Sequence, residues 1–284
     1  MKIAVCFKPI ADYARLSQKD WKWDEGHRVD TSFIRRIFNC FEESALEMAL
    51  TLSGTSEHAS DLIELTALTV DNQQGDLFLK QLLAVGYNYG VRIQCKKNPD
   101  LRFTPLVMSH LISAYIKKQG HDLVILGMQG GEGDNGQTGF LLAERLGWPC
   151  IGEVSRIIRD ESHDCLKVTS RIDGGTLVQT VHLPMVLIMG HSLDSPYLRV
   201  PNLKQKLRAK KKQVIVISDI ELGTYIDPQT NHALTNAPTP ENDKTLMDLR
   251  KPQASQSCVF IEGENAMEQA QQLYDQYLKE RLPL

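Results

Sequence analysis

The chain has 284 residues, of which 42% are hydrophobic and 24% charged, and its formal net charge is -3. These values are typical of a globular protein with a sizeable core, and they exclude a strong overall attraction to nucleic acid or to an anionic membrane. No apolar run reaches the roughly 18 residues of a membrane-spanning helix. The start, MKIAVCFKPI, is typical of a core strand and not of a signal peptide.

The cysteines are scattered along the chain, at positions 6, 40, 95, 150, 165 and 258, and they form no CxxC pair. In a chain of this length such thiols are typical of a reducing compartment, so we expect a cytoplasmic location. The histidines show no metal-ligand spacing, and we expect no metal site.

Strands and helices are predicted to alternate through the first half of the chain. Buried-strand runs are followed by amphipathic stretches that end at glycine, a common helix stop. The predicted strands cover 2–7, 62–70, 90–94 and 122–128, and the predicted helices cover 39–54, 76–86, 104–120 and 137–146. This alternation indicates an α/β fold, a parallel sheet with helices on both faces. Ligands of such sheets bind beyond the carboxyl ends of the strands.

The pattern changes after Gly152. Short runs at EVSRII, CLKVTSRI, GTLVQTVHL and MVLIMG are separated by turn residues, so we expect added antiparallel strands. A basic segment at 201–212 and a strand at 214–218 follow. Residues 222–257 are polar and rich in Pro and Asn, which is typical of an extended arm, and 264–282 form an amphipathic helix. We therefore predict a domain at 1–220 and, at 221–284, an arm whose helix packs on the body or on another chain.

The stretch 121–149, HDLVILGMQGGEGDNGQTGFLLAERLGWP, contains a G-x-G-x-x-G at Gly131, Gly133 and Gly136. A dinucleotide fingerprint needs a tight turn directly after a strand, most naturally in the first strand–helix–strand unit. Here residues 128–136 intervene before the helix, the strand is a later one, and Glu132 and Asp134 add negative charge where a pyrophosphate would approach. These features disfavour a dinucleotide site, and the missing G-K-[ST] excludes a P-loop.

Two other interpretations of this loop are a flexible connection and a cradle for a mononucleotide. Its polar side chains can hydrogen-bond a base and a ribose, and the amides at the following helix start can receive a phosphate. These side chains are Gln129, Glu132, Asp134, Asn135, Gln137 and Thr138. The residues alone favour the cradle and leave the plain turn open.

The loop reads G-x-Q-x-x-x-x-D-x-x-Q-T-G followed by L-A-E-x-L-G-W-P, and it resembles the signature loop of the electron-transfer flavoprotein β-subunit family. The likeness extends to IAVCFKPIADY at the start, to the N-x-F-x-E-x-A-L-E-x-A helix opening at Asn39, and to the segment from Pro201 to Val214. It covers residues 1–220. WPC at 148–150 and the helical end of the arm are closest to a divergent bacterial branch.

The resemblance implies a Rossmann-like α/β body, with a C-terminal arm that wraps a partner α subunit. It implies an electron carrier that is not catalytic by itself, in which an FAD held mostly by α shuttles electrons between flavoprotein dehydrogenases and an acceptor. The β subunit itself would hold AMP, or FAD in bifurcating members. The segment 201–212 would dock the donor dehydrogenase, with Leu203 as its anchor.

The nucleotide-binding residues that the resemblance implies lie at strand ends and helix starts. They are Cys6, Asn39, Cys40, Phe41, Glu42, Val70, Gly127, Met128, Gln129, Gly130, Gly131, Glu132, Gly133, Asp134, Asn135, Gly136, Gln137 and Thr138.

Plainer roles stay open for several of these residues. Asn39 suits a helix cap, Cys6 and Cys40 suit small buried side chains, and the basic tract suits a solvated face. Asp71 departs from the family pattern, and its carboxylate would repel a phosphate. A stand-alone adenine-nucleotide hydrolase or sensor is the alternative function, but positions 8–12 lack the phosphate loop of such hydrolases. The sequence does not distinguish AMP from FAD and assigns no role to Trp21 or Trp23.

Overall fold

The computed structural model of the chain describes residues 1–17, 19–21, 29–54, 63–95, 104–131, 133, 135–159, 165–192, 194, 196–223, 261, 263 and 265–279. The chain divides into two compact units, Met1–Ala237 and Pro238–Leu284. Most of the predicted arm, together with Trp23, Glu132 and Asp134, lies outside the described residues.

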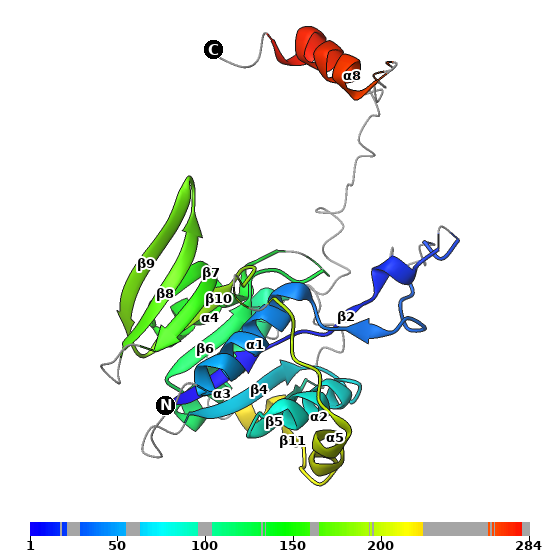
Figure 1. Ribbon diagram of the computed structural model, residues 1–284. Helices are drawn as coiled ribbons and strands as arrows, with labels where there is room; N and C mark the ends of the chain where they lie inside the picture. Colours follow the sequence, from blue (N-terminus) through cyan, green and yellow to red (C-terminus); the bar gives the residue numbers. More distant parts are fainter. Residues whose placement is uncertain are drawn as a thin grey trace. The chain divides into compact units, whose positions relative to one another are not determined.

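A nine-stranded sheet forms the centre of the first unit (Figure 1). Its strand order is β11-β5-β4-β1-β6-β10-β7-β8-β9. The strands from β11 to β7 run parallel, β8 is antiparallel to β7, and β9 is antiparallel to β8. The strands are β1 Lys2–Cys6, β4 Glu64–Val70, β5 Tyr89–Gln94, β6 Leu123–Gly127, β7 Cys150–Arg159, β8 Cys165–Ile172, β9 Gly175–His182, β10 Met185–Met189 and β11 Ile215–Ser218. A separate antiparallel pair joins β2 (Ile10–Ala11) to β3 (Arg36–Ile37).

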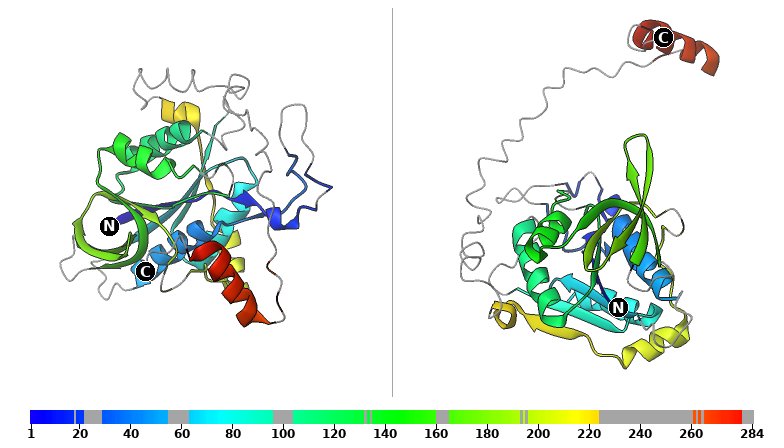
Figure 2. Two further views of the ribbon diagram at one scale, coloured as in Figure 1. Left: turned by 90° about the horizontal axis from the view of Figure 1, so that it is seen from above. Right: turned by 90° about the vertical axis from the view of Figure 1, so that its left-hand side faces the viewer.

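Helices cover both faces of the parallel part of the sheet, as the predicted α/β class requires (Figure 2). α1 and α2 pack on one face, with α5 against α2, and α3, α4 and α6 cover the other face. Each face of the sheet has its own hydrophobic core, and strand β1 contributes to both. Ile3 packs into the core beneath α1 and α2, and Ala4 packs into the core beneath α3 and α4, because successive side chains of a strand point to opposite faces. The helices are α1 Cys40–Gly54, α2 Gly75–Val85, α3 Pro105–Gln119, α4 Thr138–Leu146, α5 Leu203–Lys210 and α6 Asp219–Gly223. The Rossmann-like fold is confirmed.

The expectation of antiparallel pairing after Gly152 is confirmed for β7 with β8 and for β8 with β9, although β7 also pairs in parallel with β10, and it is wrong for the run MVLIMG. This run forms β10, which lies between β6 and β7 and runs parallel to both. Every residue of β10 is buried, because the strand has a neighbour on each side and helices above and below.

The segment 201–212, which the sequence indicates only as a basic stretch, contains helix α5. Asn202 caps this helix, since its side chain accepts a hydrogen bond from the Gln205 amide at 2.9 Å. The Gln205 side chain accepts in return from the Asn202 amide at 2.8 Å. This reciprocal capping box fixes the start of α5 at Leu203.

The second unit contains helix α8 (Ala266–Leu273) and the π-helical turn η4 (Tyr274–Leu278), which confirm the predicted C-terminal helix over 266–278. Asn265 caps α8 by accepting hydrogen bonds from the amides of Met267 and Glu268. None of the residues of α8 is buried. Among the described residues, no helix has the length and apolar character that crossing a membrane requires.

Candidate functional site

A cleft opens at the carboxyl ends of the central strands. From β1 the chain moves to β4 on one side and later to β6 on the other side, so the strand order reverses between β1 and β6. Ligands of open α/β sheets bind at such a switch point. The cleft encloses about 760 Å³, its solvent-filled mouth included. Cys6 at the end of β1 and Gly127 at the end of β6 both line it.

Many of the predicted nucleotide-binding residues come together in this cleft. Its lining includes Cys6, Glu42, Val70, Gly127, Met128, Gly130, Asn135, Gly136, Gln137 and Thr138. The predicted residues that lie outside the lining are Asn39, Cys40, Phe41, Gln129, Gly131 and Gly133. Phe41 instead contacts His191, with ring centroids 4.8 Å apart.

Helix α1 begins directly against the end of β6, and Gly127 makes this approach possible. A Cβ atom at position 127 would lie 2.9 Å from Cδ of Glu42 and 2.9 Å from its backbone nitrogen, which is too close for packed atoms. Asn39, just before α1, donates a hydrogen bond from Nδ2 to the backbone oxygen of Gln129. Its Oδ1 accepts from the Cys40 amide at 2.9 Å. Asn39 therefore ties the glycine loop to the start of α1.

Two buried polar side chains line the cleft, and each has an oxygen atom without a hydrogen-bond partner among the described residues. Glu42 is 6% exposed and Thr69 is 2% exposed. Within the described part of the chain, neither Oε2 of Glu42 nor Oγ1 of Thr69 has a hydrogen-bond partner. Leaving a buried polar atom unsatisfied costs about 1–3 kcal/mol, so this arrangement is typical of a site that a ligand completes.

Burial also sets the charge state of Glu42. Desolvation raises the pKa of its carboxyl to about 7, because the charged form loses its contact with water. Hydrogen bonding from Asn39 and the positive charge of Lys8 oppose this rise and are weaker than desolvation. Near neutral pH the carboxyl is therefore divided between its two forms, and a ligand that donates a hydrogen bond to it favours the charged form.

The start of α4 supplies backbone groups to the cleft. Gln137, Thr138 and Gly139 line it. The Gln137 amide donates to Oδ1 of Asn135 at 3.1 Å, and the amides that follow it at the helix start are of the kind that attract anions. A Cβ atom at position 139 would lie 2.6 Å from Cδ1 of Ile188 in β10. Glycine at this position therefore lets α4 lie close to the sheet and places its first amides at the cleft.

The sequence did not predict the residues of α3 and β4 that line the cleft. Pro105, Met108 and Ile112 line the cleft from α3, and Thr69 lines it from β4. Nothing in the local pattern of α3 signals this role, because the approach of its first turn to the glycine loop is a tertiary property. Thr69 had one available signal, its place beside Val70 at a carboxyl strand end. The other lining residues outside the prediction are Phe7, Lys8, Leu68, Leu126 and Gly139.

Asp71 does not stand in the cleft as an uncompensated charge. Its Oδ2 lies 2.8 Å from Nη1 of Arg36, and Arg36 also donates to the backbone oxygen of Pro9 at 2.8 Å. Burial raises the pKa of the Asp71 carboxyl, and the charge of Arg36 lowers it. Asp71 is also outside the lining of the cleft. The repulsion expected from the sequence is therefore offset by Arg36.

Helix α5 carries exposed apolar side chains in a basic setting. Leu203 is 72% exposed, Leu207 is 53% exposed and Val200, just before the helix, is 82% exposed. Leu203 and Leu207 share one face because they are four residues apart. Ala209 is buried against α2. The basic residues of the segment are Lys204, Lys206, Arg208, Lys210, Lys211 and Lys212.

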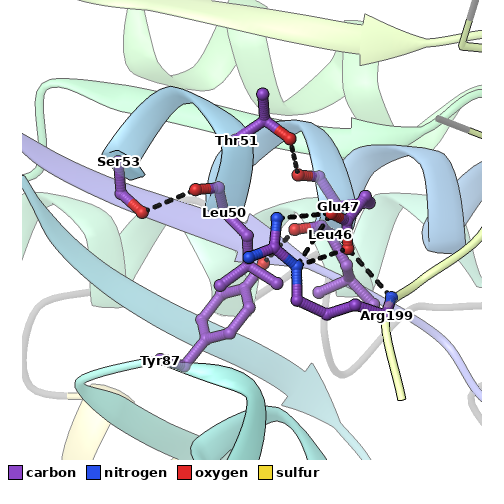
Figure 3. Close-up of polar contacts among 7 residues, drawn as sticks. All are labelled: Leu46, Glu47, Leu50, Thr51, Ser53, Tyr87 and Arg199. Atoms are coloured by element: carbon purple, nitrogen blue, oxygen red, sulfur yellow. Dashed lines mark hydrogen bonds and ion pairs between the residues drawn. The ribbon is translucent and has the colours of Figure 1, made fainter. Parts of the chain in front are cut away.

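The strap that leads into α5, residues 196–202, is anchored to α1 by Arg199 (Figure 3). Its Nε donates to the two carboxylate oxygens of Glu47 at 2.8 and 3.1 Å, and its amide donates to Oε2 at 2.9 Å. The Glu47 side chain is buried. Beside this pair, the buried Tyr87 hydroxyl donates to the Leu46 oxygen at 3.0 Å, and burial raises its pKa. The ion pair therefore fixes the segment from which Leu203 projects.

Comparison with known proteins points to one family. The sequence model of the electron transfer flavoprotein domain matches residues 29–222. The chain is 29% identical over 286 residues to the provisionally assigned electron transfer flavoprotein subunit YgcR of Escherichia coli (strain K12), with 99% of each chain covered. It is 30% identical over 241 residues to the mitochondrial electron transfer flavoprotein subunit beta of Oryza sativa subsp. indica, covering 82% of this chain and 92% of the relative.

The human relative, electron transfer flavoprotein subunit beta, is 29% identical over 225 residues, covering 78% of this chain and 83% of the relative. The domain match extends over most of the first compact unit, which contains the cleft and α5. The chain therefore belongs to the electron transfer flavoprotein β-subunit family.

Proposed function

We propose that the chain is the nucleotide-holding β subunit of a heterodimeric electron carrier. In this proposal its cleft holds AMP, or FAD in its place, as a structural group. An α subunit carries the redox-active FAD, and the complex shuttles electrons between flavoprotein dehydrogenases and an acceptor. The chain acts by binding and positioning and is not catalytic by itself.

The observation that carries the proposal is the incomplete polar lining of the cleft. Glu42 and Thr69 supply buried polar atoms without partners, and the start of α4 supplies amides suited to a phosphate. Apolar side chains of α3, among them Met108, can cover a base. These groups fit the three parts of a mononucleotide.

Two exposed surfaces are suited to the proposed partners. In the second unit, α8 exposes Met267 and Leu273, and η4 exposes Tyr277, so this helix is suited to an α subunit. In the first unit, α5 exposes Leu203 in a basic setting and is suited to an electron-donating dehydrogenase with an acidic rim.

The test is to identify the released nucleotide. The chain is purified alone and with its α partner, both samples are denatured, and the supernatants are separated by chromatography with absorbance detection. For a single-flavin shuttle, we expect the chain to release AMP, and we expect one FAD per heterodimer only when the α subunit is present. Two FAD per heterodimer supports the FAD-holding form. A colourless monomer that binds ATP tightly and no α subunit contradicts the proposal.

A further inference from the structure

We propose that Glu42 and Thr69 bind the ribose hydroxyls of the nucleotide in the cleft and make the site selective for a ribonucleotide. This inference rests on the proposed function, because it assigns a part of the ligand to side chains of the proposed nucleotide site. It identifies Thr69 as a specificity-determining residue that no sequence motif marks.

The two side chains converge on the cleft from different elements. Glu42 lies in the first turn of α1, and Thr69 lies next to the end of β4. On β4, Leu65 and Ala67 pack into the core beneath α1 and α2, so alternation along the strand places Thr69 on this same face. Oε2 of Glu42 and Oγ1 of Thr69 are both buried, both border the cleft, and both lack a partner among the residues described.

The rest of the cleft has chemistry suited to the other parts of a nucleotide. Pro105, Met108 and Ile112 offer apolar surface for a base. The amides at Thr138 and Gly139 suit a phosphate, whereas the carboxylate of Glu42 would repel one. The ribose hydroxyls are the part of the nucleotide that remains. They suit the unpartnered oxygens of Glu42 and Thr69, because a hydroxyl can donate a hydrogen bond to a carboxylate and can exchange one with a threonine hydroxyl.

The experiment compares nucleotide affinities of the full chain in its complex with the α subunit, after removal of bound nucleotide. Titration calorimetry measures binding of AMP, 2′-deoxy-AMP, 3′-deoxy-AMP and IMP. The variants are Glu42→Gln, which keeps the shape and removes the charge, and Thr69→Val, which removes only the hydroxyl. Glu43→Gln is the matched control, since it neutralises the neighbouring carboxyl in the same helical turn outside the cleft.

The expected result is that loss of a ribose hydroxyl weakens binding to the unsubstituted protein and to Glu43→Gln about 10- to 100-fold, the effect of a hydrogen bond to a charged group. In Glu42→Gln and Thr69→Val, AMP itself binds more weakly, and the deoxy analogues lose little more. Thr69→Val tests the inference independently if Glu42→Gln does not fold.

Two results overturn the inference, and they can be told apart. In the first, both deoxy analogues bind as tightly as AMP while IMP binds poorly. Glu42 and Thr69 then contact the base and not the ribose, and the proposed nucleotide site is still supported. If no adenine nucleotide binds to the unsubstituted complex, the proposed nucleotide site is wrong and the ribose assignment is lost with it.

Discussion

At the residue scale, the Glu42 carboxyl couples the stability of the nucleotide-free protein to pH. Its pKa is raised from 4.5 to about 7, mainly by burial, with Asn39 and Lys8 acting in the opposite direction. The folded chain therefore holds this proton more tightly than the unfolded chain. The contribution of this group to the free energy of unfolding is fully present below about pH 4.5 and is lost as the pH rises through about 7. The difference corresponds to about 3 kcal/mol.

We therefore expect Glu42→Gln to remove this decline in the nucleotide-free full chain. At pH 8 the variant should have a higher free energy of unfolding than the unsubstituted protein, by up to about 3 kcal/mol, and at pH 4.5 the two should be similar. Urea unfolding at both pH values measures this. Glu43→Gln, the matched control, should keep most of the decline. An equal pH dependence in Glu42→Gln and the unsubstituted protein would show that the Glu42 carboxyl titrates normally.

The ion pair of Arg199 and Glu47 gives a second prediction at this scale. Arg199→Ala leaves the Glu47 carboxylate buried without its main partner, which costs about 3–5 kcal/mol when both groups are buried. Arg199 is 47% exposed, so screening by solvent reduces the expected loss to about 1–3 kcal/mol. Denaturant unfolding measures it. Combining Arg199→Ala with Glu47→Leu should restore part of the stability, and a strictly additive double variant would contradict the coupling.

At the element scale, the sequence predicts the parallel half of the sheet well and the position of β10 poorly. The run MVLIM follows β9 after a two-residue connection, which favours a hairpin, yet it enters the sheet between β6 and β7. Its unbroken apolar character was the signal of a central parallel strand. For the site, the family resemblance and the rule that ligands bind at carboxyl strand ends indicated ten residues that line the cleft, whereas Gln129, Gly131 and Gly133 of the glycine loop lie outside its lining. Met108 and Ile112 were not predicted, because only the packing of α3 brings them to the cleft.

The start of α4 has no room for an added methyl group at Gly139. In Gly139→Ala the new Cβ would lie 2.6 Å from Cδ1 of Ile188, so the Ile188 side chain or the start of α4 must shift. We expect a loss of about 1–3 kcal/mol in stability from overpacking, together with weaker AMP binding because a shift of α4 moves its first amides. Thermal unfolding and calorimetry measure the two effects. Gly54→Ala is the matched control, since a Cβ there meets nothing within 4 Å. If Gly139→Ala loses stability but keeps its AMP affinity, the start of α4 does not take part in AMP binding.

At the scale of the whole molecule, the first unit has two separate features, the cleft and the exposed face of α5. The cleft lies between β1, β4 and β6 and the helix starts around them, whereas α5 packs on α2 and presents its leucines to solvent. The strap residue Arg199 fixes the start of α5 through Glu47, which belongs to the same helix as Glu42. Leu203 and Leu207 of α5 lie outside the lining of the cleft, so substitutions there should change partner binding without changing the nucleotide content.

This separation gives the prediction for the donor dehydrogenase. In the heterodimer, Leu203→Ala with Leu207→Ala removes the exposed apolar surface of α5, so the KM for the dehydrogenase should rise about tenfold or more, as for a buried interface anchor. The rate at saturating dehydrogenase and the released nucleotide should not change. Dye reduction measured against dehydrogenase concentration gives these values. Val178→Ala on β9 removes a comparably exposed side chain and serves as the control. Because the α5 segment is basic while the chain as a whole is negative, added salt should also raise the KM. If the KM responds neither to the leucine substitutions nor to salt, the docking surface lies elsewhere.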